Sequence, residues 1–226
     1  SRSAITVNGD VFYRSPDGVR SFIIARRDFN TWGNTPMSNE VNRVLDSDQI
    51  ALLDSGSAVV FDNRMIMTCQ PRFSDQGVTH KALVVLDFDL LTGMREKIAP
   101  AWEGIWTGLD VLQLLKVQSP TEERCFAMCL NVDSNISIWE ISKDLKNDEP
   151  IGAIVPIQWA IETRSFNFEN PFGLKRLDSG DIFAEELDGI FENDYKIDFN
   201  VRYRPDQYPG WIDWNAWDEC AKTNLC

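Results

Sequence analysis

Tight turns rich in aspartate and asparagine recur along this chain, each between two short apolar runs. They lie at Pro16-Asp17-Gly18, Asp62-Asn63, Asp133-Ser134-Asn135 and Asp178-Ser179-Gly180. Asp, Asn and Gly accept the positive φ angles that tight hairpin turns require. Several of the flanking runs alternate apolar with polar residues, which is typical of antiparallel strands. This pattern predicts an all-β protein.

The clearest set of strands lies within Ser57–Leu91. Ala58–Phe61 and Arg64–Cys69 flank one of the turns, and Lys81–Asp89 contains the most apolar run of the chain. The polar loop before that run ends at His80, the only histidine. No partner motif for a catalytic histidine accompanies it, so we interpret this stretch as scaffold.

Other segments show the same features with less regularity. Ile105–Gln118 fits a helix or a strand, and its Thr-Gly and valine residues favour a strand. Residues 28–48 predict a long loop with one helical turn near Ser38–Leu45, capped by Ser38. Ile50–Leu53 is expected to open the next group of strands, and the tail from Arg204 to be irregular. Further strands are predicted at Asp10–Ser15, Val19–Arg26, Arg124–Val132, Ile136–Ser142, Ile157–Phe168, Asp181–Leu187 and Lys196–Tyr203.

The spacing of the turns suggests a repeat. The first two lie 45 residues apart (17 to 62), as do the last two (133 to 178), with 71 residues between the pairs. A period of about 40–50 residues with four strands is typical of β-propeller blades. The alternative is an all-β sandwich with irregularly spaced turns. We predict partial β-propeller-like repeats in residues 1–150, followed by a small antiparallel β domain with a Trp-rich tail in residues 151–226.

Charge and composition narrow the functional classes. The net charge of −13 argues against direct binding to nucleic acid. No apolar run approaches the roughly 18 residues of a membrane helix, so no membrane segment is expected. The chain begins without methionine, and we expect further sequence upstream.

Known catalytic and metal-binding motifs are not found in the sequence. It has no nucleophile elbow, phosphate-binding loop or dinucleotide fingerprint. The pair Cys125 and Cys129 is not followed by a second cysteine pair, so it does not predict a zinc site. We therefore predict no enzyme activity, no catalytic or metal-ligating residues and no cofactor.

The tryptophans are the best candidates for contacts with a partner. Trp211, Trp214 and Trp217 are spaced by three and would share one face of a helix. Their segment packs on its own domain or forms an aromatic platform for a protein or a sugar ring. Trp32 lies in the long loop 28–48, a second candidate contact region.

Several stretches together resemble a known family. They are GDVFYRSPDGVRSF, RVLDSD, VVFDNRMIMTCQP, HKALVVLDFD and VRYRPDQYPGW. These resemble the propeller-bearing, nozzle- or hub-like tail proteins of tailed bacteriophages. The resemblance implies a structural virion protein that is assembled in the host cytoplasm, contacts other tail proteins and copies of itself, and needs no cofactor. The alternative is a carbohydrate-binding module or glycan depolymerase on a β-propeller.

Overall fold

The protein is mostly β-strand, which confirms the all-β prediction. The computed structural model describes residues 3–23, 36–89, 101–142, 148, 155, 157–162, 199–205 and 208–217. The chain divides into two compact units, Ser1–Leu145 and Lys146–Cys226. Within the described ranges, no helix is long and apolar enough to cross a membrane.

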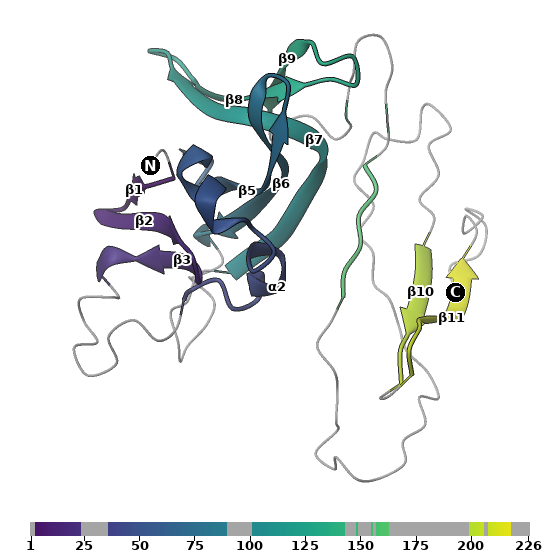
Figure 1. Ribbon diagram of the computed structural model, residues 1–226. Helices are drawn as coiled ribbons and strands as arrows, with labels where there is room; N and C mark the ends of the chain where they lie inside the picture. The colour runs from purple at the N-terminus through teal and green to yellow at the C-terminus, as the bar shows by residue number, and fades with distance from the viewer. Residues whose placement is uncertain are drawn as a thin grey trace. The chain divides into compact units, whose positions relative to one another are not determined.

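The first unit begins with a small three-stranded antiparallel sheet, drawn in purple in Figure 1. Asn8 and Gly9 turn the chain between the first two strands with φ angles of 49° and 82°. Phe22 and Ile23, which were predicted to continue the third strand, are not part of it. The strands are β1 (Ile5–Val7), β2 (Asp10–Ser15) and β3 (Gly18–Ser21).

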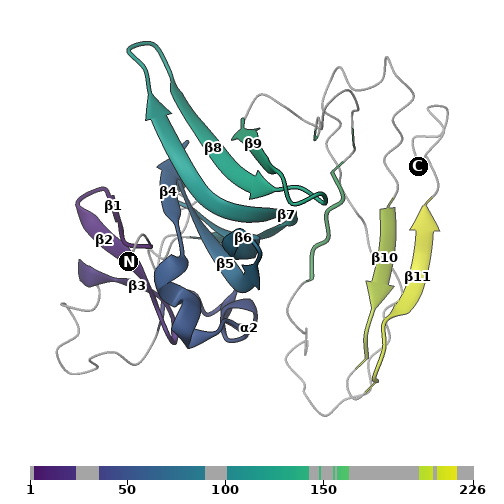
Figure 2. The same ribbon diagram turned by 45° about the horizontal axis from the view of Figure 1, so that its top comes forward.

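The larger sheet of this unit is antiparallel and six-stranded, with its strands side by side in chain order. The six strands therefore form a meander. Ile105–Gln118, whose sequence fitted either a helix or a strand, belongs to the long strand β7. Figure 2 shows this strand and its neighbour sweeping across the others. The strands are β4 (Ala58–Phe61), β5 (Arg64–Ser74), β6 (Gly77–Asp87), β7 (Ala101–Gln118), β8 (Glu123–Leu130) and β9 (Ile136–Ile141).

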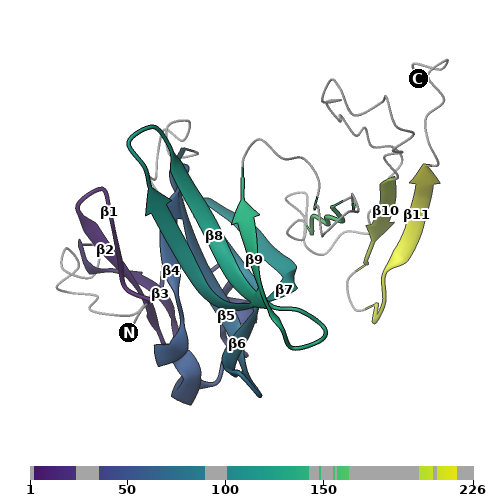
Figure 3. The same cartoon turned by 90° about the horizontal axis from the view of Figure 1, so that it is seen from above.

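This sheet curls into a half-barrel, and the cause lies in the β6–β7 pairing. The register shifts twice between these strands, and Gly104 and Gly108 of β7 have φ angles of 120° and 108°. Register shifts and positive-φ glycines bend a strand and increase its twist. The curvature brings Leu114 of β7 back to Ser57, at the start of β4, and Figure 3 shows the curl from above.

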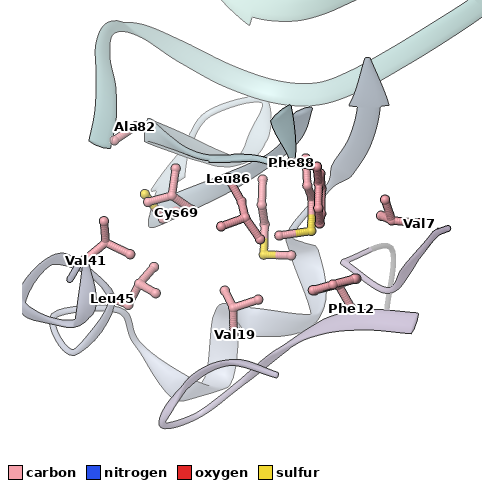
Figure 4. Packing of buried hydrophobic residues seen from close by; sticks show 12 residues of the cluster. Val7, Phe12, Val19, Val41, Leu45, Cys69, Ala82, Leu86 and Phe88 are labelled. Carbon is pink, nitrogen blue, oxygen red and sulfur yellow. The ribbon is translucent and has the colours of Figure 1, made fainter. Parts of the chain in front are cut away.

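Away from the exposed turn that joins them, strands β5 and β6 are buried on both faces, which explains the continuous apolar run of β6. One face packs against β1–β3, where Phe12 and Val19 lie opposite Leu86 (Figure 4). The other face lies inside the curl, where Leu83 packs with Leu114. The single curled sheet and the small sheet therefore share a core through β5 and β6.

Two short helices complete this core: α2 (Asn42–Leu45) and the 3-10 helix η1 (Ile50–Ser55). The prediction that Ser38 caps α2 was wrong, because the N-cap is Val41 and no side chain caps it. Ser38 Oγ instead accepts a hydrogen bond from the Val19 N–H at 3.0 Å. The expectation of a strand group opening at Ile50–Leu53 was also wrong, since these residues lie in η1.

The second unit contains a two-stranded antiparallel hairpin, β10 (Phe199–Tyr203) and β11 (Ile212–Trp217). The predicted strand Lys196–Tyr203 is confirmed over its last five residues. The tail was predicted to be irregular, but its tryptophans lie in or beside β11. The first six residues of the predicted strand Ile157–Phe168 form no strand. The rest of that segment and the predicted strand Asp181–Leu187 lie outside the described residues.

Candidate functional site

The convex side of β7–β9 carries apolar side chains that no other described element covers. Cross-strand pairing places Phe126 beside Leu115, and Met128 beside Ile138. Ile136 and Ile138 are 58% and 69% exposed. Contiguous exposed apolar surface of this kind marks interaction sites in many proteins. We call this surface the outer face, made of Leu115, Val117, Phe126, Met128, Leu130, Ile136 and Ile138.

The outer face ends at β9, which is the last strand of the sheet among the described residues. Asn131 and Asn135 form a hydrogen-bonded pair at the end of the β8–β9 ladder, since the Asn131 N–H donates to Asn135 O at 2.9 Å. Hydrogen-bonded and non-hydrogen-bonded pairs alternate along antiparallel strands, so Ser137 and Trp139 also lie in hydrogen-bonded pairs with β8. Ser137 and Trp139 therefore direct their backbone groups toward β8. The N–H and C=O groups of the even-numbered residues of β9 point away from the sheet. An open edge of this kind is a template for pairing with another strand.

One ion pair neutralises the only charged side chain of β9. Arg124 Nε lies 2.7 Å from Glu140 Oε1, and a second hydrogen bond joins Arg124 Nη2 to Glu140 Oε2. The Arg124 guanidinium also lies 5.1 Å from the centre of the Phe126 ring. Its hydrogen bonds lower the pKa of the Glu140 carboxyl below the usual value. Both side chains are solvated, so the pair contributes little stability and leaves the edge without net charge.

The aromatic hairpin of the second unit is the other candidate. The rings of Tyr203 and Trp214 meet edge to face with centroids 6.5 Å apart. Arg204 lies 4.8 Å from the centre of the Trp211 ring, and its Nη2 is 3.4 Å from Glu162 Oε1. Trp211 and Trp214 are 42% and 40% exposed. Aromatic rings flanked by charged groups are suited to contacts with proteins or sugars.

The structure separates the tryptophans that the sequence grouped. Trp214 packs against Tyr203, the last residue of β10, and Trp211 packs against Arg204, the residue after it. Successive residues of an extended chain point to opposite faces, so the two rings lie on opposite faces of the hairpin and form no common platform. The common face that the spacing would give in a helix does not occur, because Ile212–Trp217 form a strand. Trp217 ends β11 in register with Phe199, and only its backbone is described. Trp32 lies outside the described residues.

A buried polar cluster joins the small sheet to the curled one. Arg14 Nη2 lies 3.3 Å from Asp48 Oδ2, and their side chains are 3% and 1% exposed. Arg14 also donates to Leu45 O at 2.7 Å, and Asp48 accepts the Gln70 N–H at 2.8 Å. Burial raises the pKa of the Asp48 carboxyl, while the Gln70 N–H and Arg14 act in the opposite direction.

This cluster contains a Ser–His pair that cannot act on a substrate. His80 Nε2 lies 3.4 Å from Ser55 Oγ, and Nδ1 lies 3.2 Å from the Val111 carbonyl oxygen. Activation of serine requires an accessible nucleophile and a base oriented by a third group. His80 is 1% exposed, and the adjacent cavity of about 10 Å³ has room for about one water molecule. The cluster is therefore structural.

Cys69 lies in the core between β1–β3 and the curled sheet, and Cys125 and Cys129 lie in the core inside the curl. Burial raises the pKa of Cys69 and Cys129 to about 12 and that of Cys125 to about 11, so all three remain thiols. Cys69 lies on the opposite face of the sheet from the other two. Among the residues that the structure describes, no three His, Cys, Asp or Glu side chains gather as metal ligands.

The sequence predictions did not include the outer face. A signal for it exists in β9, where Ile136 and Ile138 alternate with Trp139 and Ile141. A strand that is apolar on both faces is typical of a buried position, yet β9 lies at an edge. An edge strand that is apolar on both faces therefore indicates a surface that another element can cover.

Comparisons with known proteins give no relative: no family model, no curated protein and no solved structure matches this chain.

Proposed function

We propose that this chain is an assembly subunit that associates with copies of itself through the outer face and the open edge of β9. The supporting observation is the exposed alternation of Ile136 and Ile138 on an edge strand whose only charged side chain is already paired. Edge strands commonly carry lysine, proline or a bulge that prevents pairing. β9 carries none of these over Ile136–Ile141.

The edge geometry favours one register between two copies. Pairing must keep the outer-face side chains on one side, because a slip by one residue exchanges the faces. An antiparallel pairing centred on Ser137 sets Ile136 of one copy opposite Ile138 of the other. It places Glu140 opposite Ser134 of the other copy, so that like charges are not directly opposed. The two sheets then continue as one, with both outer faces on the same side.

In the wider proposal, the subunit is a structural component of a phage virion tail, of the nozzle or hub type. It would be assembled in the host cytoplasm, contact other tail proteins and act without a cofactor or an enzyme activity. The resemblance of the sequence to propeller-bearing tail proteins is the support for this assignment. Propeller-like repeats and a small C-terminal β domain belong to this proposal, with further sequence or further copies completing the repeats.

Cysteine cross-linking tests the edge pairing. Two Ser137 residues would face each other in a non-hydrogen-bonded pair, with Cα atoms about 4.5 Å apart, within the range of a disulfide. Ser137→Cys is therefore expected to give covalent dimers under mild oxidation. Thr121→Cys, exposed in the turn before β8, and the parent chain with its own five cysteines are the controls. Equal cross-linking in all three would contradict this register.

A carbohydrate-binding role is the second candidate, supported by the exposed rings of Trp211 and Trp214. Because these rings lie on opposite faces, a single sugar chain can stack on one of them only. We expect Trp211→Ala and Trp214→Ala to differ in glycan-array binding, with one variant losing the signal and the other retaining it. Unchanged binding in both variants, or no binding by the parent chain, would remove this candidate.

A further inference from the structure

His80 lies where three parts of the first unit meet. Its backbone pairs with Pro71 of β5 and with Val111 of β7, and its side chain reaches Ser55 of η1. The ladder between β6 and β7 shifts register directly after it. The ring therefore attaches η1 to the curled sheet at a point where the backbone ladder is interrupted.

The hydrogen-bond pattern around the ring depends on its protonation state. Neutral His80 with a proton on Nδ1 donates to the Val111 carbonyl, 3.2 Å away. Ser55 Oγ donates its only proton to Leu52 O at 2.6 Å, so it has none to offer to Nε2. Protonation of Nε2 would create a donor to Ser55 Oγ, and it would also place a full charge in a buried site.

The charged groups around the ring compensate that charge only in part. Asp48, which precedes η1, faces the same small cavity as His80, but its carboxylate is already paired with Arg14 of β2. From β5, Thr68 and Pro71 line the same cavity and neither carries a charge, and β7 contributes the Val111 carbonyl. Lys81 and Asp110 pair with each other at 2.6 Å. A protonated His80 would therefore leave the cluster with a net buried positive charge.

We infer that His80 makes the first unit sensitive to acid: protonation of its ring weakens the attachment of η1 and the Arg14–Asp48 cluster to the curled sheet. The inference concerns the fold of the subunit and is independent of the proposed self-association. Burial lowers the pKa of His80 below its usual value of 6.5, against smaller opposing effects of Val111 and Asp48. A lowered pKa in the folded state means that acidification below about 6.5 favours the unfolded or opened chain.

The single histidine makes the test direct. Its ring protons are followed by NMR in the full chain as the pH is lowered, and amide hydrogen exchange of Ile50–Ser55 is measured at pH 7.5 and 5.0. We expect a titration midpoint below 6.5 and, after correction for intrinsic rates, faster exchange in η1 at pH 5.0. A midpoint at or above 6.5 in the folded chain would overturn the inference.

A variant separates His80 from the other titrating groups. His80→Asn retains a side-chain donor for the Val111 carbonyl and cannot be protonated in this range. Asp48 contributes with the opposite sign, since its raised pKa favours the folded chain at low pH, and this contribution is present in both proteins. Each pH unit by which the folded midpoint lies below 6.5 lowers the folding constant about tenfold in acid. Equal acid sensitivity in parent and variant would also overturn the inference.

Discussion

Ser57 and Leu114 are 57 residues apart in the chain, yet their groups share two hydrogen bonds across the curl of the sheet. The Leu114 N–H donates to Ser57 Oγ at 3.1 Å, and Ser57 Oγ lies 3.4 Å from Leu114 O. The Ser57 N–H in turn donates to Thr68 Oγ1 at 2.9 Å. One buried hydroxyl thus links the residue before β4 to the middle of β7 and stabilises the curvature of the sheet.

Removal of that hydroxyl tests its role. Ser57→Ala leaves the buried Leu114 N–H without its partner, and we expect the free energy of unfolding to fall by about 1–3 kcal/mol in urea titration. Ser74→Ala is the matched control, because Ser74 Oγ bonds to Gly77 O at an exposed turn. Its expected loss is below about 0.5 kcal/mol. Similar losses in the two variants would contradict the importance of the Ser57 contact.

Gly18 and Gly77 provide a second matched pair. Both begin a strand after a hairpin turn, with φ angles of 137° and 119°. A methyl group at Gly18 would lie 2.7 Å from Pro36 Cβ and would also collide with Ser38 Oγ, whereas nothing lies within 4 Å at Gly77. Both alanine variants suffer backbone strain of about 1–3 kcal/mol, and only Gly18→Ala adds a collision. We expect Gly18→Ala to melt at the lower temperature; the reverse order would contradict the packing of residues 36–38 on β3.

The Arg14–Asp48 pair is expected to show strong coupling. Arg14→Met leaves the Asp48 carboxylate buried without its cation, and loss of one partner of a buried pair costs about 3–5 kcal/mol. The double variant Arg14→Met with Asp48→Leu removes both charges, and we expect it to recover most of that loss. Urea titration of Arg14→Met, Asp48→Leu and the double variant measures the coupling. Additive losses would show that the two side chains do not act as a pair.

The strands could be predicted because their signals are local. Asp10–Ser15 and Ala58–Phe61 are short runs bounded by Asx turns, and the structure has β2 and β4 at these bounds. The pairing of strands into one curled sheet could not be predicted in this way. It depends on register shifts beside His80 and on contacts such as Ser57 with Leu114, which link residues far apart in sequence.

The tryptophan hairpin and the outer face were harder to predict, because both depend on contacts between residues far apart in the sequence. The spacing of Trp211, Trp214 and Trp217 suits one face of a helix, but the tertiary context makes this segment a strand. The outer face depends on which strand ends the sheet. Ile136 and Ile138 look like core residues in the sequence, and only the sheet order places them at an open edge.

Self-association through β9 is tested by the molar mass of the chain in solution, measured by light scattering over a range of concentrations. We expect a mass that exceeds the 25.8 kDa of one chain and rises with concentration. We expect Ile138→Lys to return the mass to 25.8 kDa without changing the circular dichroism, because Ile138 is an exposed side chain. Val132→Lys, in the exposed turn of the same hairpin, is expected to behave like the parent chain. A parent chain that remains at 25.8 kDa, or an Ile138→Lys variant as large as the parent, would contradict self-association through β9.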